Sequence, residues 1–111
     1  MAIIIKTHDA NGLLDNIIKA IESGKIDTWS YKDGYFTHTP EQWRYKAWLK
    51  PQIISGELKL GIYPPKDKSI SSSIYGIYHG RFIEMMLVHF DKEFFHIYAT
   101  ALIAPPDYMK I

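Results

Sequence analysis

Two histidines and one arginine are the residues of this chain best suited to acid–base chemistry. His38 lies between two threonines, and His79 lies two residues before Arg81. A neutral imidazole accepts protons near pH 7, and a guanidinium binds carboxylates and phosphates. We therefore consider a small hydrolase or transferase acting on an anionic substrate, with His38 or His79 as the general base. Arg81 or Lys46 would hold the anion.

The segment around His38 also has a structural interpretation. Thr39-Pro40-Glu41-Gln42 has the pattern of a capping box, with proline at the first helical position. The pattern predicts one or two helical turns over residues 40–44. It explains Thr39 and Gln42 without any catalytic role, and we favour it.

The segment from Tyr75 to Glu84 carries the densest set of polar groups. On a helix with about 100° per residue, His79 falls among apolar side chains, whereas Arg81 and Glu84 point elsewhere. We expect a buried His79, hydrogen-bonded to a strand carbonyl or a tyrosine, and a local Arg81–Glu84 ion pair. The alternative for His79 is a general base or ligand beneath the sheet. Gly76 and Gly80, four residues apart, predict close approach of another backbone or a ligand.

Basic and aromatic residues interleave in the middle of the chain. Residues 44–68 hold six basic side chains and two acidic ones, and tryptophans and tyrosines lie between them. This composition is typical of a groove for single-stranded nucleic acid, but we favour a solvated hairpin with ordinary surface lysines. The candidate binding residues, including two from the last strand, are Trp43, Arg44, Lys46, Trp48, Lys59, Tyr63, His96 and Tyr98.

Periodicity and turn signals predict a two-layer α+β domain. We expect a mainly antiparallel sheet of five or six strands with two helices on one face, in the order β-α-β-β-turn-β-β-α-β. The domain spans residues 1–104, and 105–111 form a C-terminal tail. The predicted elements are strand 2–7, a helix capped by Asp9 or Asn11 and ended by Ser23-Gly24, hairpin 26–39, hairpin 45–63, a helix from the serines at 69–73 to about residue 90, and strand 94–103.

Helices on one face leave the other face of the sheet to be explained. Lys59, Tyr63, His96 and Tyr98, with Trp29 or Tyr31, would line it. An exposed face with aromatic side chains suits a second copy of the chain, a protein partner or single-stranded nucleic acid. The alternative is that a loop or the C-terminal tail covers it.

Composition and motif spacing exclude several kinds of site and partner. The chain of 111 residues has no cysteine and a net charge of +1, and no apolar run reaches the ~20 residues that span a bilayer. Metal-ligand spacings, phosphate-binding loops and dinucleotide motifs are absent, so we expect no metal, no cofactor and no membrane partner. The leading hypothesis is a soluble, cytoplasmic, non-enzymatic binding domain, dimeric or bound to a protein partner. Nucleic acid ranks after a protein.

Overall fold

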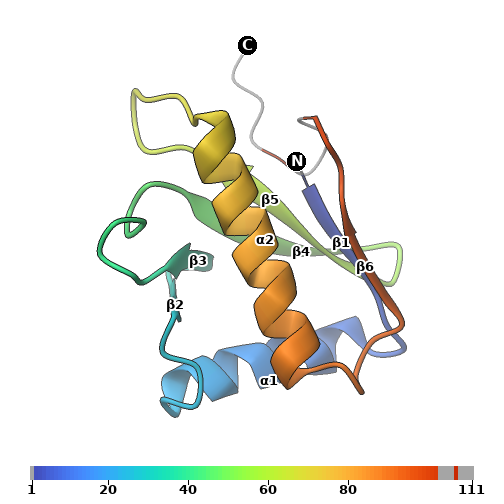
Figure 1. Cartoon of the computed structure of the whole chain (residues 1–111). Coiled ribbons are helices and arrows are strands. Elements are labelled where there is room, and N and C mark those ends of the chain that lie inside the picture. Colours follow the sequence, from blue (N-terminus) through green and yellow to red (C-terminus); the bar gives the residue numbers. More distant parts are fainter. Residues whose placement is uncertain (1, 103–106, 108–111) are drawn as a thin grey trace.

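Six strands form one antiparallel sheet, and the two helices pack on one side of it in the computed structural model, which describes residues 2–102 and 107 (Figure 1). The strand order across the sheet is β2-β3-β4-β5-β1-β6. The predicted class and element order are confirmed. The elements are β1 (Ala2–Lys6), α1 (Ala10–Glu22), β2 (Trp29–Lys32), β3 (Tyr35–His38), β4 (Trp48–Ile54), β5 (Glu57–Tyr63), α2 (Ser72–His89) and β6 (His96–Ala99).

Local signals explain where these elements begin and turn. The Asp9 carboxylate accepts a hydrogen bond from the Gly12 N–H at 2.9 Å and caps α1. Both hairpins turn through two residues with positive φ, Asp33-Gly34 and Ser55-Gly56. Such turns match the right-handed twist of the flanking strands, which is why these dipeptides predicted the hairpins correctly.

The core lies between the helices and the sheet. Ile3 pairs with Leu60 and Ile5 with Leu58, and these four side chains are fully buried. Phe82 of α2 packs over them as part of the same apolar cluster. Each such side chain contributes roughly 1.5–3 kcal/mol by leaving water. The same alternation sends the intervening residues of β1 and β5 to the opposite face.

The segment after β3 agrees with its prediction in the helical turn but not in the cap or in the start of the next strand. The Arg44 N–H donates to the Pro40 carbonyl at 2.9 Å, which closes a single helical turn. The predicted Thr39 cap is wrong, because the Thr39 hydroxyl donates to the Asp27 carbonyl at 2.6 Å and so closes the base of the hairpin. The backbone reverses at Tyr45, with φ of 61°, and the strand predicted from Tyr45 therefore begins at Trp48.

Trp29 and Tyr31 do not line the face of the sheet away from the helices. Trp29 is 2% exposed, and its ring meets the Phe82 ring edge-on at 5.2 Å. Tyr31 packs against the same core. Alternation in β2 separates its two faces correctly, but the helices cover the face that carries the aromatic rings.

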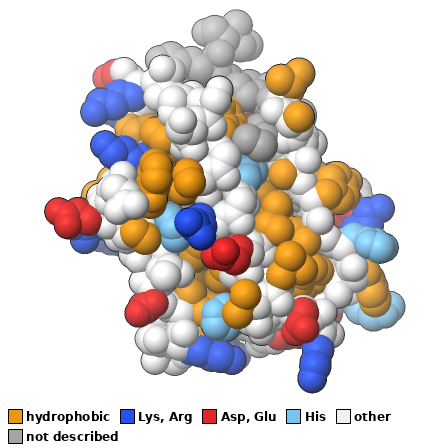
Figure 2. All heavy atoms as spheres, viewed as in Figure 1, with side chains coloured by type: hydrophobic (Ala, Val, Ile, Leu, Met, Phe, Trp, Pro, Cys, Tyr) orange, Lys and Arg blue, Asp and Glu red, His pale blue; other side chains and the backbone are white. Residues whose placement is uncertain are grey.

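The outer side of α2 is exposed. A Cβ atom added at Gly76 or Gly80 would meet nothing within 4 Å, so the close approach predicted for them is not present among the residues that the structure describes. Leu87 and Val88 are 52% and 66% exposed, and hydrophobic side chains show along this face of the molecule (Figure 2). No helix in the described part of the chain is long and apolar enough to cross a membrane.

Of the predicted tail, Asp107 is the residue that the structure describes; 105, 106 and 108–111 lie outside the described residues. Asp107 is 6% exposed, and its carboxylate accepts a hydrogen bond from the Ile62 N–H at 2.7 Å. The carboxylate is therefore the acceptor for a backbone N–H of β5 that lies one residue past the end of the β1–β5 pairing.

Candidate functional site

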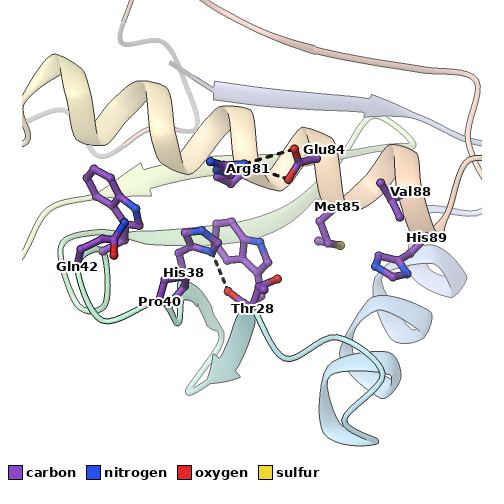
Figure 3. Close-up of a pocket in the computed structure, with 11 residues that line it drawn as sticks. Thr28, His38, Pro40, Gln42, Arg81, Glu84, Met85, Val88 and His89 are labelled. Atoms are coloured by element: carbon purple, nitrogen blue, oxygen red, sulfur yellow. Dashed lines mark hydrogen bonds and ion pairs between the residues drawn. The ribbon is translucent and has the colours of Figure 1, made fainter.

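A cleft of about 390 Å³ separates α2 from the base of the β2–β3 hairpin (Figure 3). Thr28, His38, Pro40 and Trp43 line it on the strand and turn side. The hairpin brings Thr28 and His38 together, because Trp29 and His38 are register partners and Thr28 directly precedes β2. The single turn after β3 then carries Pro40 and Trp43 over the same hollow.

His38 lies in this cleft with a defined tautomer. Its Nδ1 lies 2.7 Å from the Thr28 carbonyl oxygen. A carbonyl can only accept, so Nδ1 carries the hydrogen and donates it. Burial lowers the pKa of His38 below its usual 6.5; the Arg81 charge lowers it further, and the Thr28 hydrogen bond and Glu84 oppose the shift. The ring is therefore neutral at pH 7, and its Nε2 lone pair is an acceptor.

Arg81 and Glu84 form the opposite, charged wall of the cleft. Arg81 Nη1 lies 3.4 Å from both carboxylate oxygens of Glu84, so the predicted ion pair is confirmed. Their side chains are 51% and 62% exposed, which limits the strength of the pair. Figure 3 shows both on the side of α2 that faces His38.

His79 lies elsewhere. It is 2% exposed on the core side of α2, and its Nδ1 lies 2.8 Å from the Tyr75 carbonyl of the preceding helical turn. The Tyr75 ring stacks on it at 5.8 Å. The predicted burial is correct, and one hydrogen-bond partner of His79 is a carbonyl of its own helix. Of the three predicted catalytic residues, the structure brings His38 and Arg81 together and keeps His79 outside the cleft.

Two apolar residues of the cleft were not predicted. Met85 and Val88 line it beside Glu84. They lie four and seven residues after Arg81, which is the spacing of one helical face, so a wheel centred on Arg81 would have found them. His89 lines the far end of the same wall. Within residues 2–102 and 107, no group of three or more His, Asp or Glu side chains is placed to hold a metal ion.

The face of the sheet away from the helices brings together five of the predicted binding residues. Trp48 pairs with Tyr63, and Lys59 pairs with Ile4, which in turn pairs with Tyr98. Paired residues of neighbouring strands point to the same face, and these point away from the helices. His96, two residues before Tyr98, shares their side. We call Tyr35, Trp48, Lys50, Lys59, Tyr63, His96 and Tyr98 the open face.

Three half-buried rings form a hollow at one end of the open face. Tyr35, Trp48 and Tyr63, with Pro64, line a space of about 250 Å³. The Tyr35 and Tyr63 rings meet edge-on at 5.6 Å, and Lys50 Nζ lies 6.0 and 5.9 Å from their centroids. Tyr35 and Lys50 were missed by sequence reasoning, since only the strand register shows that they join Tyr63.

The three remaining predicted binding residues lie in the turn before β4. Trp43 packs against the core and lines the cleft, so it does not belong to the open face. Arg44 is exposed, and its guanidinium carbon lies 5.6 Å from the Tyr45 centroid; that ring stacks on Trp48 at 6.5 Å. Lys46 is exposed next to them. Arg44 and Lys46 thus border the open face beside its hollow.

Comparison of the chain with family models, curated proteins and solved structures found no match.

Proposed function

We propose that this chain is a binding domain that holds single-stranded nucleic acid on the open face. The observation that carries this proposal is the hollow of Tyr35, Trp48 and Tyr63 with Lys50 beside two of its rings. Half-buried rings offer faces on which planar bases stack, and neighbouring cations pair with phosphates. Both kinds of group occur here within one surface.

Lys50 distinguishes between the ligands that such rings could hold. Three aromatic side chains around a hollow commonly bind a cation through their negative faces. Here the Lys50 ammonium already lies about 6 Å from the Tyr35 and Tyr63 centroids. A second cation would be repelled by it. A planar group attached to an anion gains from the rings and from Lys50 alike.

Charge also favours an anionic partner over a second copy of the chain. Lys6, Lys50 and Lys59 lie on this side of the sheet, where Glu57 contacts Lys6 and Lys59 at 3.8 Å each. Two copies meeting face to face would place lysines against lysines, which opposes a symmetric dimer through this surface. This reverses the order expected from the sequence, in which a protein partner came before nucleic acid.

The test is the salt dependence of binding to a fluorescently labelled oligothymidine of ten nucleotides. Arg44, Lys46, Lys50 and Lys59 are four cations in or beside the open face. If all four contact phosphates, affinity falls about 50-fold between 50 and 200 mM salt, at a slope of roughly −0.7 per contact. Trp48→Ala should weaken binding by about 5- to 150-fold at either salt concentration, from the loss of ~1–3 kcal/mol of stacking.

Lys19→Gln is the matched control for charge. Lys19 lies in the last turn of α1, away from the open face, and is exposed. Its variant should bind the oligonucleotide like the wild-type chain, whereas Lys50→Gln should bind more weakly and with a shallower salt slope. An affinity that does not change with salt, or equal losses in both variants, would refute the proposal.

Two further expectations from the sequence remain proposals. A dimer would bury Leu87 and Val88 of α2 better than the charged open face, and sedimentation at tens of micromolar would detect it against the 12.9 kDa monomer. The absence of cysteine favours a reducing compartment such as the cytoplasm. We place the enzyme alternative after the binding function, since Glu84 neutralises Arg81 and would oppose an anionic substrate in the cleft.

A further inference from the structure

The cleft beside α2 presents three polar groups of different kinds. Arg81 is a cation, Glu84 is an anion, and neutral His38 is an acceptor. Both charges act on the pKa of His38, so both lie near its ring. Their sum is zero. A ligand that carries only a negative charge meets Glu84, and a ligand that carries only a positive charge meets Arg81.

His38 Nε2 is open to the cleft. The hydrogen bond to Thr28 uses Nδ1, and the ring makes no other hydrogen bond within the described residues. In the same part of the chain, every buried side-chain nitrogen or oxygen has a hydrogen-bond partner. Nε2 is therefore not sealed in the core, and the ring that carries it lines the hollow. It accepts a hydrogen bond from a ligand donor.

Arg81 has donors to spare for a ligand. Its contacts with Glu84 use Nη1 at 3.4 Å, a long hydrogen bond, and leave the other N–H groups of the guanidinium without a partner in the described residues. A guanidinium offers five N–H donors and binds a carboxylate with two of them. Arg81 can thus bind a ligand carboxylate while Glu84 stays beside it.

The rest of the cleft suits a short apolar group. Pro40, Met85 and Val88 contribute apolar surface between the charged wall and the turn. A volume of about 390 Å³ equals roughly 13 water molecules at ~30 Å³ each. A ligand of about a dozen non-hydrogen atoms would fill it.

We propose that this cleft binds a zwitterion of amino-acid size. The ligand carboxylate pairs with Arg81, its ammonium group donates to Glu84 and to His38 Nε2, and its apolar side chain packs against Met85 and Val88. This is a second site, separate from the open face, and it does not depend on nucleic-acid binding.

Three ligands of one shape test the proposal: L-phenylalanine, 3-phenylpropionate, which lacks the ammonium group, and 2-phenylethylamine, which lacks the carboxylate. Each is titrated into the ¹⁵N-labelled wild-type chain at pH 7.5 and followed by amide chemical shifts. Phenylalanine should saturate, with shifts confined to residues 28–29, 38–43 and 81–89. The other two should bind at least tenfold more weakly.

Variants test which charged side chain binds which group of the ligand. Arg81→Gln should lower the affinity for phenylalanine at least tenfold and leave that for 2-phenylethylamine unchanged or higher, because a repelling cation is gone. Glu84→Gln should also lower the affinity for phenylalanine at least tenfold, but it should improve the binding of 3-phenylpropionate, because the repelling anion is gone. Lys19→Gln on α1 should change neither.

Three results would overturn the inference. One is no saturable shift with phenylalanine up to 20 mM. Another is equal affinity for phenylalanine and 3-phenylpropionate, which would make the cleft an anion site. The third is a shift pattern outside the cleft. None of them bears on oligonucleotide binding, so the two proposals fail separately.

Discussion

The Tyr78 hydroxyl joins α2 to the segment between β3 and β4, and Tyr78→Phe removes it without changing the apolar ring. The hydroxyl donates to the Trp43 carbonyl and lies 3.1 Å from Thr37 Oγ1, which in turn donates to the Ala47 carbonyl at 2.8 Å. Tyr78 is fully buried. The variant therefore leaves a part-buried carbonyl without its donor, at a cost of about 1–3 kcal/mol. For a domain of this size, each kcal/mol lowers Tm by roughly 4 °C, so Tm should fall by about 4–12 °C.

Urea unfolding followed by tryptophan fluorescence measures the loss directly, and thermal circular dichroism measures Tm. Tyr98→Phe is the matched control, because it deletes a tyrosine hydroxyl from a side chain that is 48% exposed on the open face. It should change stability by no more than ~0.5 kcal/mol. If both variants unfold at the same urea concentration, the Tyr78 hydroxyl does not hold the segment and the reasoning is refuted.

Two other predictions concern α2 and the residue facing it. Burial lowers the pKa of His38 in the folded chain below its unfolded value of 6.5, so the unfolded chain binds the proton more readily. The contribution of neutral His38 to stability is therefore complete above pH 6.5. It is lost as the pH falls from 6.5 through the lower pKa of the folded chain. The urea midpoint should fall less between pH 7.5 and 5 in His38→Gln than in the wild-type chain, and equal falls would contradict the shift. Gly76→Ala and Gly80→Ala should each stabilise the chain by about 0.5–1 kcal/mol, since both positions are exposed within α2 and an added Cβ has space; destabilisation by either would show that the glycine is needed.

The architecture was predictable because its signals are local. Asp33-Gly34 and Ser55-Gly56 take the positive φ values that such dipeptides favour, and the alternation of β5 separates Leu58 and Leu60 from Lys59 without knowledge of any neighbour. Which side of β2 the helices would cover is not a local property. The rings of Trp29 and Tyr31 were therefore placed on the wrong face, although their alternation was read correctly.

The candidate sites were only partly predictable, because each joins distant segments. The helical wheel separates Arg81 from His79, but it cannot show that His38, more than 40 residues earlier, faces Arg81 across a cleft. The position of Lys50 depends on register. It pairs with Gly61, two residues before Tyr63, and its Nζ lies 5.9 Å from the Tyr63 ring centroid. Asp107 contacts β5 from beyond the last strand, and no periodic pattern in the sequence predicts such a contact.

The segment between β3 and β4 connects the two proposed sites physically. Trp43 lines the cleft, and two residues later Tyr45 stacks on Trp48 at the edge of the open face. The Tyr78 hydroxyl holds this segment by the Trp43 carbonyl. Variants at Arg81 and Lys50 should each affect one ligand, since each side chain belongs to one site. Tyr78 belongs to neither site. Because Tyr78→Phe loosens the segment that supports both sites, it should weaken the binding of phenylalanine and of the oligonucleotide together.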